Sequence, residues 1–415
     1  MGEGKNNCNW ARIRKNCAQA NFPDGYSASI FSSISEVNEK EWSELADKTN
    51  LYLSFSYLKI LEANAPAGMQ PIYLLVKNKA GNPRFQAVLQ LHHFRLPRQA
   101  AQTAQKPGYL SFRNFLINVF SRKSIRLLTF GNAFISGIPA YQYHNEVNAD
   151  EAMAWIELAI EQIKSTLQPD AVFLKDLSNS LEKCTKPSGY SPFATEPNMV
   201  FTLHQGWKTF SDYQESLSSK YRKNQKALEI KKENLTERDL TVNNLKALET
   251  EIDKLYTAVF KHAKFGLGKM RSGYFAAMKE QFPDNFFVKG YFEGEQLIAF
   301  MSYTLLGDLL DAHFIGFDYS KNKTYGLYAN MLYDFLKCAL KYGCTSINYN
   351  RTAAEIKSNV GAVPQQLCCC IRLVNPISNH LMKPVFDRMK PEPFVIRKPF
   401  KTAEASHEVI ASQAV

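Results

Sequence analysis

The same order of expected helices and strands occurs twice along this chain of 415 residues, and this duplication limits the possible folds more than any other feature. In each half we expect the order helix, strand, strand, helix, strand. In the first half the expected elements include helix 55–64, strands 72–77, 84–94 and 125–130, helix 149–167 and strand 171–177. In the second half they include helix 272–281, strands 286–292, 296–305 and 309–317, helix 328–342 and strand 345–350. The pattern predicts an α/β (α+β) protein with two domains, each a mixed, mostly antiparallel, twisted sheet flanked by helices.

The expected domain boundaries follow the composition of the connecting segments. Residues 1–27 are polar and irregular, so they predict a loose N-terminal segment. We expect the two domains at 28–205 and 206–395. The small, polar residues that follow predict a flexible tail at 396–415.

Composition excludes several classes of protein. Charged residues make up 21% and aromatic residues 13% of the chain, which is typical of packed globular proteins and not of disordered ones. The longest apolar stretch, 297–317, is interrupted by Gly307, Asp308 and Asp311, so it predicts two strands and a turn and not a membrane span. None of the eight cysteines has a metal-ligand spacing, and the first residues lack the apolar core of a signal peptide. We expect a cytoplasmic protein without a metal site, with peripheral contact at the inner membrane face left open.

A net charge of +11 indicates anionic partners without identifying one. Two segments concentrate positive charge: 109–123, where basic residues surround aromatic ones at helical spacing, and the helix expected at 210–234. Segment 109–123 suits an anionic membrane surface or the shielding of an apolar substrate. The basic helix suits the phosphates of a donor carrier or an acidic lipid. A core-facing helix in the first case, and a solvated helix face in the second, explain the same patterns.

The connection after strand 309–317 aims backbone N–H groups of the next helix beyond the strand end, where a phosphate would be held. Lys323, Thr324, Gly326 and Tyr328 partly match the Arg/Gln-x-x-Gly-x-Gly/Ala loop with which the GNAT acyltransferases bind the pyrophosphate of acyl-CoA. Lys323 stands where that loop has Arg or Gln, and Tyr328 replaces its last small residue. A plain strand-to-helix connection would show the same single glycine.

A more specific resemblance covers residues 210–364. The residues that carry it are Ser219, Tyr221, Arg222 and Lys223 on the basic helix, Asn350 and Arg351 at a strand end, and Lys357, Gly361 and Ala362 after it. They resemble the BioF2-like and FemAB-like acyltransferases, a branch of the GNAT superfamily built from one or two GNAT-type domains. The first half of the chain resembles these proteins only in element order. The resemblance implies tandem GNAT-like domains that move an acyl group from a thioester, or an aminoacyl group from tRNA, to an amine.

Such a reaction needs no covalent nucleophile. The acceptor amine must lose a proton to a base, and the developing oxyanion needs N–H donors, which the splayed strands of a GNAT sheet supply. His313, on the same strand face as Asp311, is the leading candidate base, although a satisfied histidine in the sheet fits as well. Glu355 is a second candidate base. Tyr349 is a candidate donor to the leaving thiolate, or a packed aromatic residue.

We expect the acceptor to be held where strand 345–350 ends. Arg351 suits bidentate binding of an acceptor carboxylate. Surface ion pairing among Arg351, Glu355 and Lys357 is the alternative. The other residues assigned to substrate binding are Asn350, Lys357, Tyr221 and Arg222.

Three functions remain open from the sequence. The first is an N-acyltransferase with acyl-CoA or acyl-ACP as co-substrate, no tightly bound cofactor, and an amine acceptor such as an amino-acid lipid head group. The second is a Fem-like transferase that takes aminoacyl groups from tRNA and acts on peptidoglycan precursors. The third is a catalytically inactive GNAT-like binding module, which the departures at Lys323 and Tyr328 would suit. We favour the first, because there is no room between Asn234 and Leu240 for the helical-hairpin arm of several tRNA-dependent members.

Overall fold

The computed structural model divides the chain into two compact units, which are described separately. It describes residues 20–21, 25–47, 49–95, 124–178, 181, 183, 189–262, 267–389 and 393–401. One unit comprises Met1–Thr195 and Leu367–Glu392, and the other Glu196–Gln366 and Pro393–Val415. The basic and aromatic segment 109–123 lies outside the described residues, as does most of the expected N-terminal segment. No described helix combines the length and apolarity needed to cross a bilayer.

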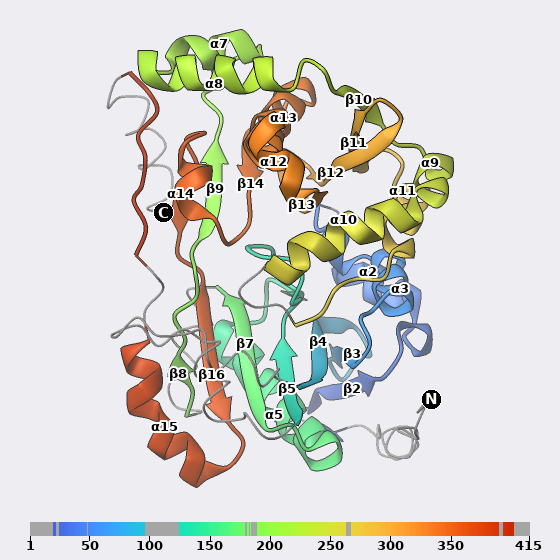
Figure 1. Cartoon of the computed structure of the whole chain (residues 1–415). Coiled ribbons are helices and arrows are strands. Elements are labelled where there is room, and N and C mark those ends of the chain that lie inside the picture. The colour runs from blue at the N-terminus through green and yellow to red at the C-terminus, as the bar shows by residue number, and fades with distance from the viewer. Residues whose placement is uncertain are drawn as a thin grey trace. The chain divides into compact units, whose positions relative to one another are not determined.

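The first unit is built on a nine-stranded sheet (Figure 1). Its strands are β1 (Ala20–Asn21), β2 (Ser27–Phe31), β3 (Met69–Lys77), β4 (Pro83–Arg95), β5 (Ser124–Phe130), β6 (Tyr141–Tyr143), β7 (Ala171–Leu177), β8 (Ser191–Pro192) and β16 (Cys368–Leu373). Its helices are η2 (Ile34–Glu36), α2 (Glu39–Leu45), η3 (Leu51–Leu53), α3 (Phe55–Ala63), α5 (Ala149–Leu167) and α15 (Pro376–Arg388). The strand order is β1-β2-β3-β4-β5-β7-β16-β8, with β6 paired to β4.

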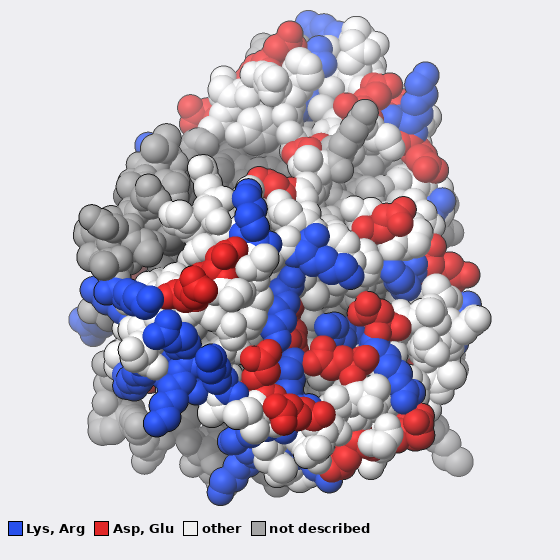
Figure 2. Space-filling view, turned by 90° about the horizontal axis from the view of Figure 1, so that it is seen from above, with Lys and Arg blue, Asp and Glu red and all other residues white. Residues whose placement is uncertain are grey.

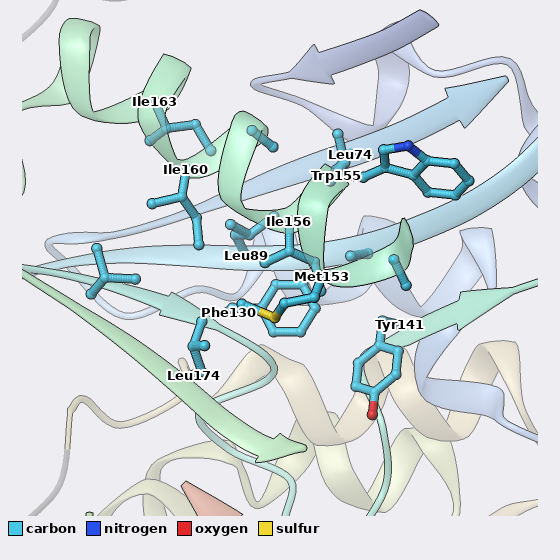
Figure 3. Packing of buried hydrophobic residues seen from close by; sticks show 14 of the residues in the cluster. Leu74, Leu89, Phe130, Tyr141, Met153, Trp155, Ile156, Ile160, Ile163 and Leu174 are labelled. Carbon is cyan, nitrogen blue, oxygen red and sulfur yellow. The ribbon is translucent and has the colours of Figure 1, made fainter. Parts of the chain in front are cut away.

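Helix α5 forms the core of the first unit with one face of this sheet. The helix begins at a capping box in which Asn148 and Glu151 satisfy each other's backbone N–H groups. Its apolar residues recur every three or four positions, so Met153, Ile156 and Ile160 point to the same side (Figure 3). They pack among buried side chains of β3, β4, β5 and β7. The helix occupies the residues that the sequence predicted.

The second unit is built on a seven-stranded sheet in the order β10-β11-β12-β13-β14-β9-β15. These strands are β9 (Asn198–Thr202), β10 (Thr236–Asp239), β11 (Phe286–Glu293), β12 (Gln296–Leu306), β13 (Leu309–Phe317), β14 (Ser346–Asn348) and β15 (Val363–Gln365). The helices are α7 (Phe210–Ser216), α8 (Ser219–Lys231), α9 (Val242–Ala247), α10 (Glu249–His262), α11 (Gly273–Gln281), α12 (Tyr319–Tyr325), α13 (Leu327–Lys341) and α14 (Ala354–Ser358). The predicted basic helix 210–234 is therefore two helices, α7 and α8.

The two sheets share one topology. In each, antiparallel strands lead to one parallel pair, β5 with β7 in the first unit and β13 with β14 in the second. A helix connects the members of each parallel pair, α5 in one unit and α13 in the other. Antiparallel strands complete both sheets. The predicted mixed, mostly antiparallel α/β class and the predicted duplication are confirmed.

The units do not divide at the single boundary predicted between residues 205 and 206. Strand β9 pairs with β14 and β15 in the second unit, whereas β16 returns from late in the chain to pair with β7 and β8 in the first. A strand's hydrophobic pattern identifies it as a strand but does not identify its partners. Sequence order alone therefore placed both strands in the wrong unit.

The segment 393–401 is packed, unlike the flexible tail predicted from 396. Phe400 lies 5.8 Å from Trp207 and 6.1 Å from Tyr213 between ring centroids. Ser218 donates its backbone N–H to the carbonyl of Pro399, and Lys401 donates to Ser216. These contacts bind the segment to the junction of α7 and α8. Residues 402–415 lie outside the described part.

Close packing of α10 on β13 depends on a glycine. A Cβ atom at Gly316 would lie 2.8 Å from backbone atoms of Leu255 and Tyr256 in α10. Only a residue without a side chain lets the helix backbone approach the strand this closely. Helix α13 packs on β12, β13 and β14, so β13 is fixed by helices as well as by strands.

Candidate active site

Strands β13 and β14 form a fork. They run side by side for three residue pairs, of which the last joins Asp311 to Asn348. Beyond that pair, β13 continues to Phe317 alongside β12 alone among the described strands. An edge of this kind presents backbone N–H and C=O groups without strand partners.

The register between β12 and β13 determines which backbone groups face the open side of the fork. Asp318 donates its N–H to Ile298, and the same register continues through Phe300 opposite Gly316. Because hydrogen-bonded pairs alternate in an antiparallel ladder, Gly316 bonds to β12. The N–H groups of Ile315 and Phe317 therefore point away from β12, towards the side that β14 has left.

Exposure agrees with this geometry. His313 is partly exposed as a residue, but its side chain is only 1% exposed, so the exposed part is main chain. Ile315, two residues further along the strand, is also partly exposed. The edge of β13 is therefore partly accessible at His313 and Ile315, whereas Phe317 is 4% exposed.

Asp311 is the polar centre of the fork. Its carboxylate is fully buried, and one oxygen accepts hydrogen bonds from the side-chain amides of Asn348 at 2.9 Å and Asn350 at 3.1 Å. Asn198 on β9 donates to the amide oxygen of Asn348 at 2.8 Å. A buried charge needs such partners to offset the loss of water. Two asparagines at the end of β14 therefore bind this carboxylate, and Asn198 on β9 supports one of them.

His313 lies between Asp311 and a tyrosine. The Nδ1 atom of His313 is 3.8 Å from the second carboxylate oxygen of Asp311, and Nε2 is 2.7 Å from the hydroxyl of Tyr274. Tyr274 is buried at the start of α11, and its ring stacks on the imidazole with a centroid distance of 5.5 Å. The resulting order, carboxylate, imidazole and phenol, is suited to moving a proton. Sequence analysis found Asp311 and His313 on one strand face but missed Tyr274, which no local pattern connects to a strand 39 positions away.

The loop after β14 is strained and held by a buried lysine. Asn350, Thr352 and Ala353 have φ values of 61°, 70° and 51°, in the left-handed region that costs energy for residues other than glycine. Lys357 donates from Nζ to the carbonyls of Asn350 at 3.1 Å and Arg351 at 2.7 Å. Burial lowers the pKa of Lys357 to about 7, a shift that Glu196 partly opposes. Lys357 thus contacts the loop backbone, whereas the sequence predicted a substrate contact.

Asn350 joins the two arms of the fork. Besides Asp311, its amide contacts the carbonyl of Ala312 on β13 at 2.8 Å. Arg351 follows it, half-buried at the end of the β14 arm. Asn350 therefore contacts β13 where the two arms separate, and Arg351 is the next residue along the chain.

Two predicted catalytic residues have other contacts. Tyr349 is 3% exposed, and its hydroxyl donates to the carbonyl of Leu332 on α13 at 2.8 Å, so burial raises its pKa well above the usual range. The carboxylate of Glu355 is 45% exposed and accepts two bonds from the guanidinium of Arg397. Neither side chain is among the described partners of Asp311 or His313. Glu355 forms an ion pair, as the alternative interpretation predicted, but its partner is Arg397 and not Arg351 or Lys357.

The expected pyrophosphate loop is folded as a helix. Residues 319–325 form α12. Asp318 caps its N-terminus, and Gly326, with a φ of 61°, caps its C-terminus. A Cβ atom at Gly326 would lie 2.6 Å from Leu228, so this glycine lets α8 pack against the joint between α12 and α13. The N–H of Tyr328 already donates to the side chain of Asn322 at 3.0 Å. The first turn of α13 is therefore partly capped by the chain itself.

The remaining predicted residues lie around this joint. Lys323 and Thr324 are exposed on α12. Tyr328 is half-buried, with its ring 6.1 Å from that of Phe317. On α8, Tyr221 packs against the core of the second unit and Arg222 is half-buried. None of them is a described hydrogen-bond partner of the fork.

The described residues include no cluster of three His, Cys, Asp or Glu side chains that could hold a metal ion. The fork therefore offers backbone donors, a buried proton-accepting group and a fixed polar loop. Together these suit a substrate carbonyl that develops negative charge beside an amine that loses a proton.

No protein-family model matches this sequence, and no curated protein sequence matches it. Several solved structures are similar. The crystal structure of FemX shares 10% identical residues with a TM-score of 0.49, over 84% of this chain and 98% of that one. A tandem GNAT protein from the clavulanic acid biosynthesis pathway shares 9% at a TM-score of 0.47, over 85% and 98%. L-PGS from Bacillus licheniformis shares 11% at a TM-score of 0.44, over 79% and 95%.

These structures include proteins of the kind that the sequence resembles. Similarities of this size carry no argument about activity.

Proposed function

We propose that this chain is an N-acyltransferase that moves an acyl group from a carrier to an amine at the fork between β13 and β14. One observation carries the proposal: the N–H groups of Ile315 and Phe317 point to the open side of the fork, next to the buried pair Asp311 and His313. Backbone donors of this kind bind and polarise a carbonyl without reorganising during the reaction. A base beside them makes the acceptor amine nucleophilic.

The proposed reaction is direct transfer. The neutral amine attacks the carrier-linked carbonyl, and the oxyanion of the tetrahedral intermediate accepts hydrogen bonds from the β13 edge. The amine proton passes through the Tyr274 hydroxyl to His313, and Asp311 stabilises the imidazolium. Collapse of the intermediate forms the amide bond and breaks the bond to the carrier. For a thioester, the expelled thiolate takes the proton back from the imidazolium of His313 through the Tyr274 hydroxyl, which gives the free thiol and restores the neutral base.

The loop after β14 is the proposed acceptor site. Arg351 would bind an acceptor carboxylate, because a guanidinium forms paired hydrogen bonds with a carboxylate. Lys357 binds the carbonyl of Arg351, so the backbone that carries this side chain is held in place before the acceptor binds. An amine that carries a carboxylate, such as an amino-acid head group, fits these groups.

The capped start of α13 bears on the choice of carrier. The N–H of Tyr328 is already bonded to Asn322, so the joint offers fewer donors to a pyrophosphate than the expected loop would. This favours acyl-ACP over acyl-CoA, because the phosphopantetheine of a carrier protein has no pyrophosphate. The same observation favours aminoacyl-tRNA, which is the second candidate donor.

A thiol-release assay tests the proposal. The full chain is mixed with acyl-ACP or acyl-CoA of several chain lengths and a mixture of amines, and free thiol and amide product are measured. Arg351→Ala should lower turnover at least tenfold, whereas Lys40→Ala, an exposed change in the first unit, should leave turnover unchanged. A parallel reaction contains aminoacyl-tRNA as the donor. Amide formation in that reaction, without turnover of either thioester, would establish the tRNA-dependent transferase. Absence of amide product from all three donors would refute acyl transfer.

A further inference from the structure

Helix α8 is held firmly on one side. Lys232, just beyond its end, donates to the carboxylate of Asp334 on α13 at 2.8 Å, and Glu229 pairs with Lys337 at 3.0 Å. Gln225 is buried and bonded to Gln214 of α7 at 2.6 Å. Leu228 lies against Gly326. The inner face of α8 therefore consists of Gln225, Leu228, Glu229 and Lys232, which are spaced three or four residues apart.

The outer face of α8 is basic. At 100° per residue, the side opposite the inner face is centred on Lys223 and Ile230, with Lys226 beside them and Lys220 and Lys231 at its edge. All five are exposed, and Ile230 is 62% exposed. The single carboxylate of α8, Glu229, is occupied by Lys337. Figure 2, which views the side where α7 and α8 lie in Figure 1, shows Lys and Arg side chains gathered on part of this side, with Asp and Glu side chains beside them.

A second segment adds cations at the start of α8. Lys398 and Lys401 are exposed, and their segment is hydrogen-bonded to Ser216 and Ser218. Basic residues in the first turn of a helix oppose its dipole, and α8 has no acidic residue there and no side-chain cap. An external anionic surface would relieve this repulsion.

We infer that the outer face of α8, with Lys220, Lys223, Lys226 and Ile230, docks on an anionic lipid surface. This inference does not depend on the proposed acyl transfer. A basic helix about 20 Å long that lies flat on a bilayer gains about 1 kcal/mol for each lysine near the charged surface. Ile230 adds apolar contact at the boundary between head groups and acyl chains. RNA is the less suitable partner, because the exposed positions of this face include no aromatic side chain on which a base would stack.

Sedimentation with vesicles tests the docking. The full chain is mixed with vesicles of phosphatidylcholine alone or of equal parts phosphatidylcholine and phosphatidylglycerol. It should pellet with the anionic vesicles only, and high salt should release it. Replacing Lys220, Lys223 and Lys226 together by Gln should weaken binding roughly 100-fold. Ile230→Ser should weaken it roughly fivefold.

Matched controls separate this face from net charge. Changing Lys40, Lys79 and Lys183 to Gln, all exposed in the first unit, removes the same charge and should leave binding within about threefold of the parent. Equal vesicle binding by the α8 variant and the parent would overturn the inference. A second result would also overturn it: polyuridylic acid binds as tightly as the anionic vesicles, and Ile230→Ser changes the affinity for neither of them. Helix α8 would then be a general polyanion site.

Discussion

The side-chain amide of Asn350 donates to the buried carboxylate of Asp311 across 3.1 Å, and this bond joins the two arms of the fork where their backbones separate. The same amide contacts the carbonyl of Ala312, so it replaces a strand partner that β14 no longer provides. The φ of 61° at Asn350 shows that the backbone is held in an unfavourable conformation to reach this position. Asn350 therefore links the two arms at the point where the fork opens.

Removal of the Asn350 amide should reduce stability and turnover. Asn350→Gly tolerates the left-handed backbone but loses both bonds, and we expect it to lower the free energy of unfolding by about 1–3 kcal/mol and turnover at least tenfold. Asn350→Ala loses the same bonds and adds backbone strain, which should cost roughly 1 kcal/mol more. Urea unfolding and the rate of amide formation measure the two effects. Parent-like turnover in the glycine variant would show that the fork does not need this bond.

Tyr274→Phe tests the proton path. The variant keeps the ring that stacks on His313 but removes the hydroxyl 2.7 Å from Nε2. We expect a loss of stability of about 1–3 kcal/mol, because a buried nitrogen loses its partner. Turnover should fall about 100-fold, with KM nearly unchanged. If the hydroxyl were only structural, kcat at saturating substrate would stay close to that of the parent.

Lys357 should make stability depend on pH. Its pKa is about 7 in the folded chain because of burial, whereas an exposed lysine in the unfolded chain titrates near 10.4. Between these values the unfolded chain binds the extra proton, so stability contributed by this position rises with pH from about 7 upwards and is lowest below 7. Relative to Lys357→Met, the free energy of unfolding of the parent should rise by roughly 1.4 kcal/mol per pH unit between pH 7 and pH 9.

Urea unfolding of both proteins from pH 6 to pH 9 measures this difference. Loss of the two bonds to the loop carbonyls should add a destabilisation of Lys357→Met that does not vary with pH. A parallel pair of stability curves would mean that Lys357 keeps an ordinary pKa in the folded chain.

Glu355→Gln should leave turnover nearly unchanged. Its carboxylate is 45% exposed and bound by Arg397, so the expected change in stability is below about 1 kcal/mol. A double-mutant cycle with Arg397→Ala should give a coupling of the same small size. A loss of turnover beyond tenfold, with the fold intact, would restore Glu355 as a base.

The sequence predicted most of the elements but not all of their partners. Helix α5 and the strands around it follow clear periodicities, whereas the exchange of β9 and β16 depends on pairing across the whole chain. Residues 319–325 form a helix where a loop is predicted, although Asp318 and Gly326 are residue types that commonly begin and end helices. The link between His313 and Tyr274 had no such signal, because it arises only when α11 packs on β13. Local chemistry was therefore predictable, and contacts between distant segments were not.

Phe400 should anchor the late segment to the second unit. Its ring packs against Phe201, Trp207 and Tyr213, over the space left by Gly361. Because the ring is only half-buried, Phe400→Ala should lower the free energy of unfolding by about 2 kcal/mol, less than the loss of a fully buried phenylalanine. Lys398→Ala, two residues away and exposed, should change it by less than about 0.5 kcal/mol. Urea unfolding compares the two variants, and equal stability of both would mean that the segment is loose in solution, as the sequence first indicated.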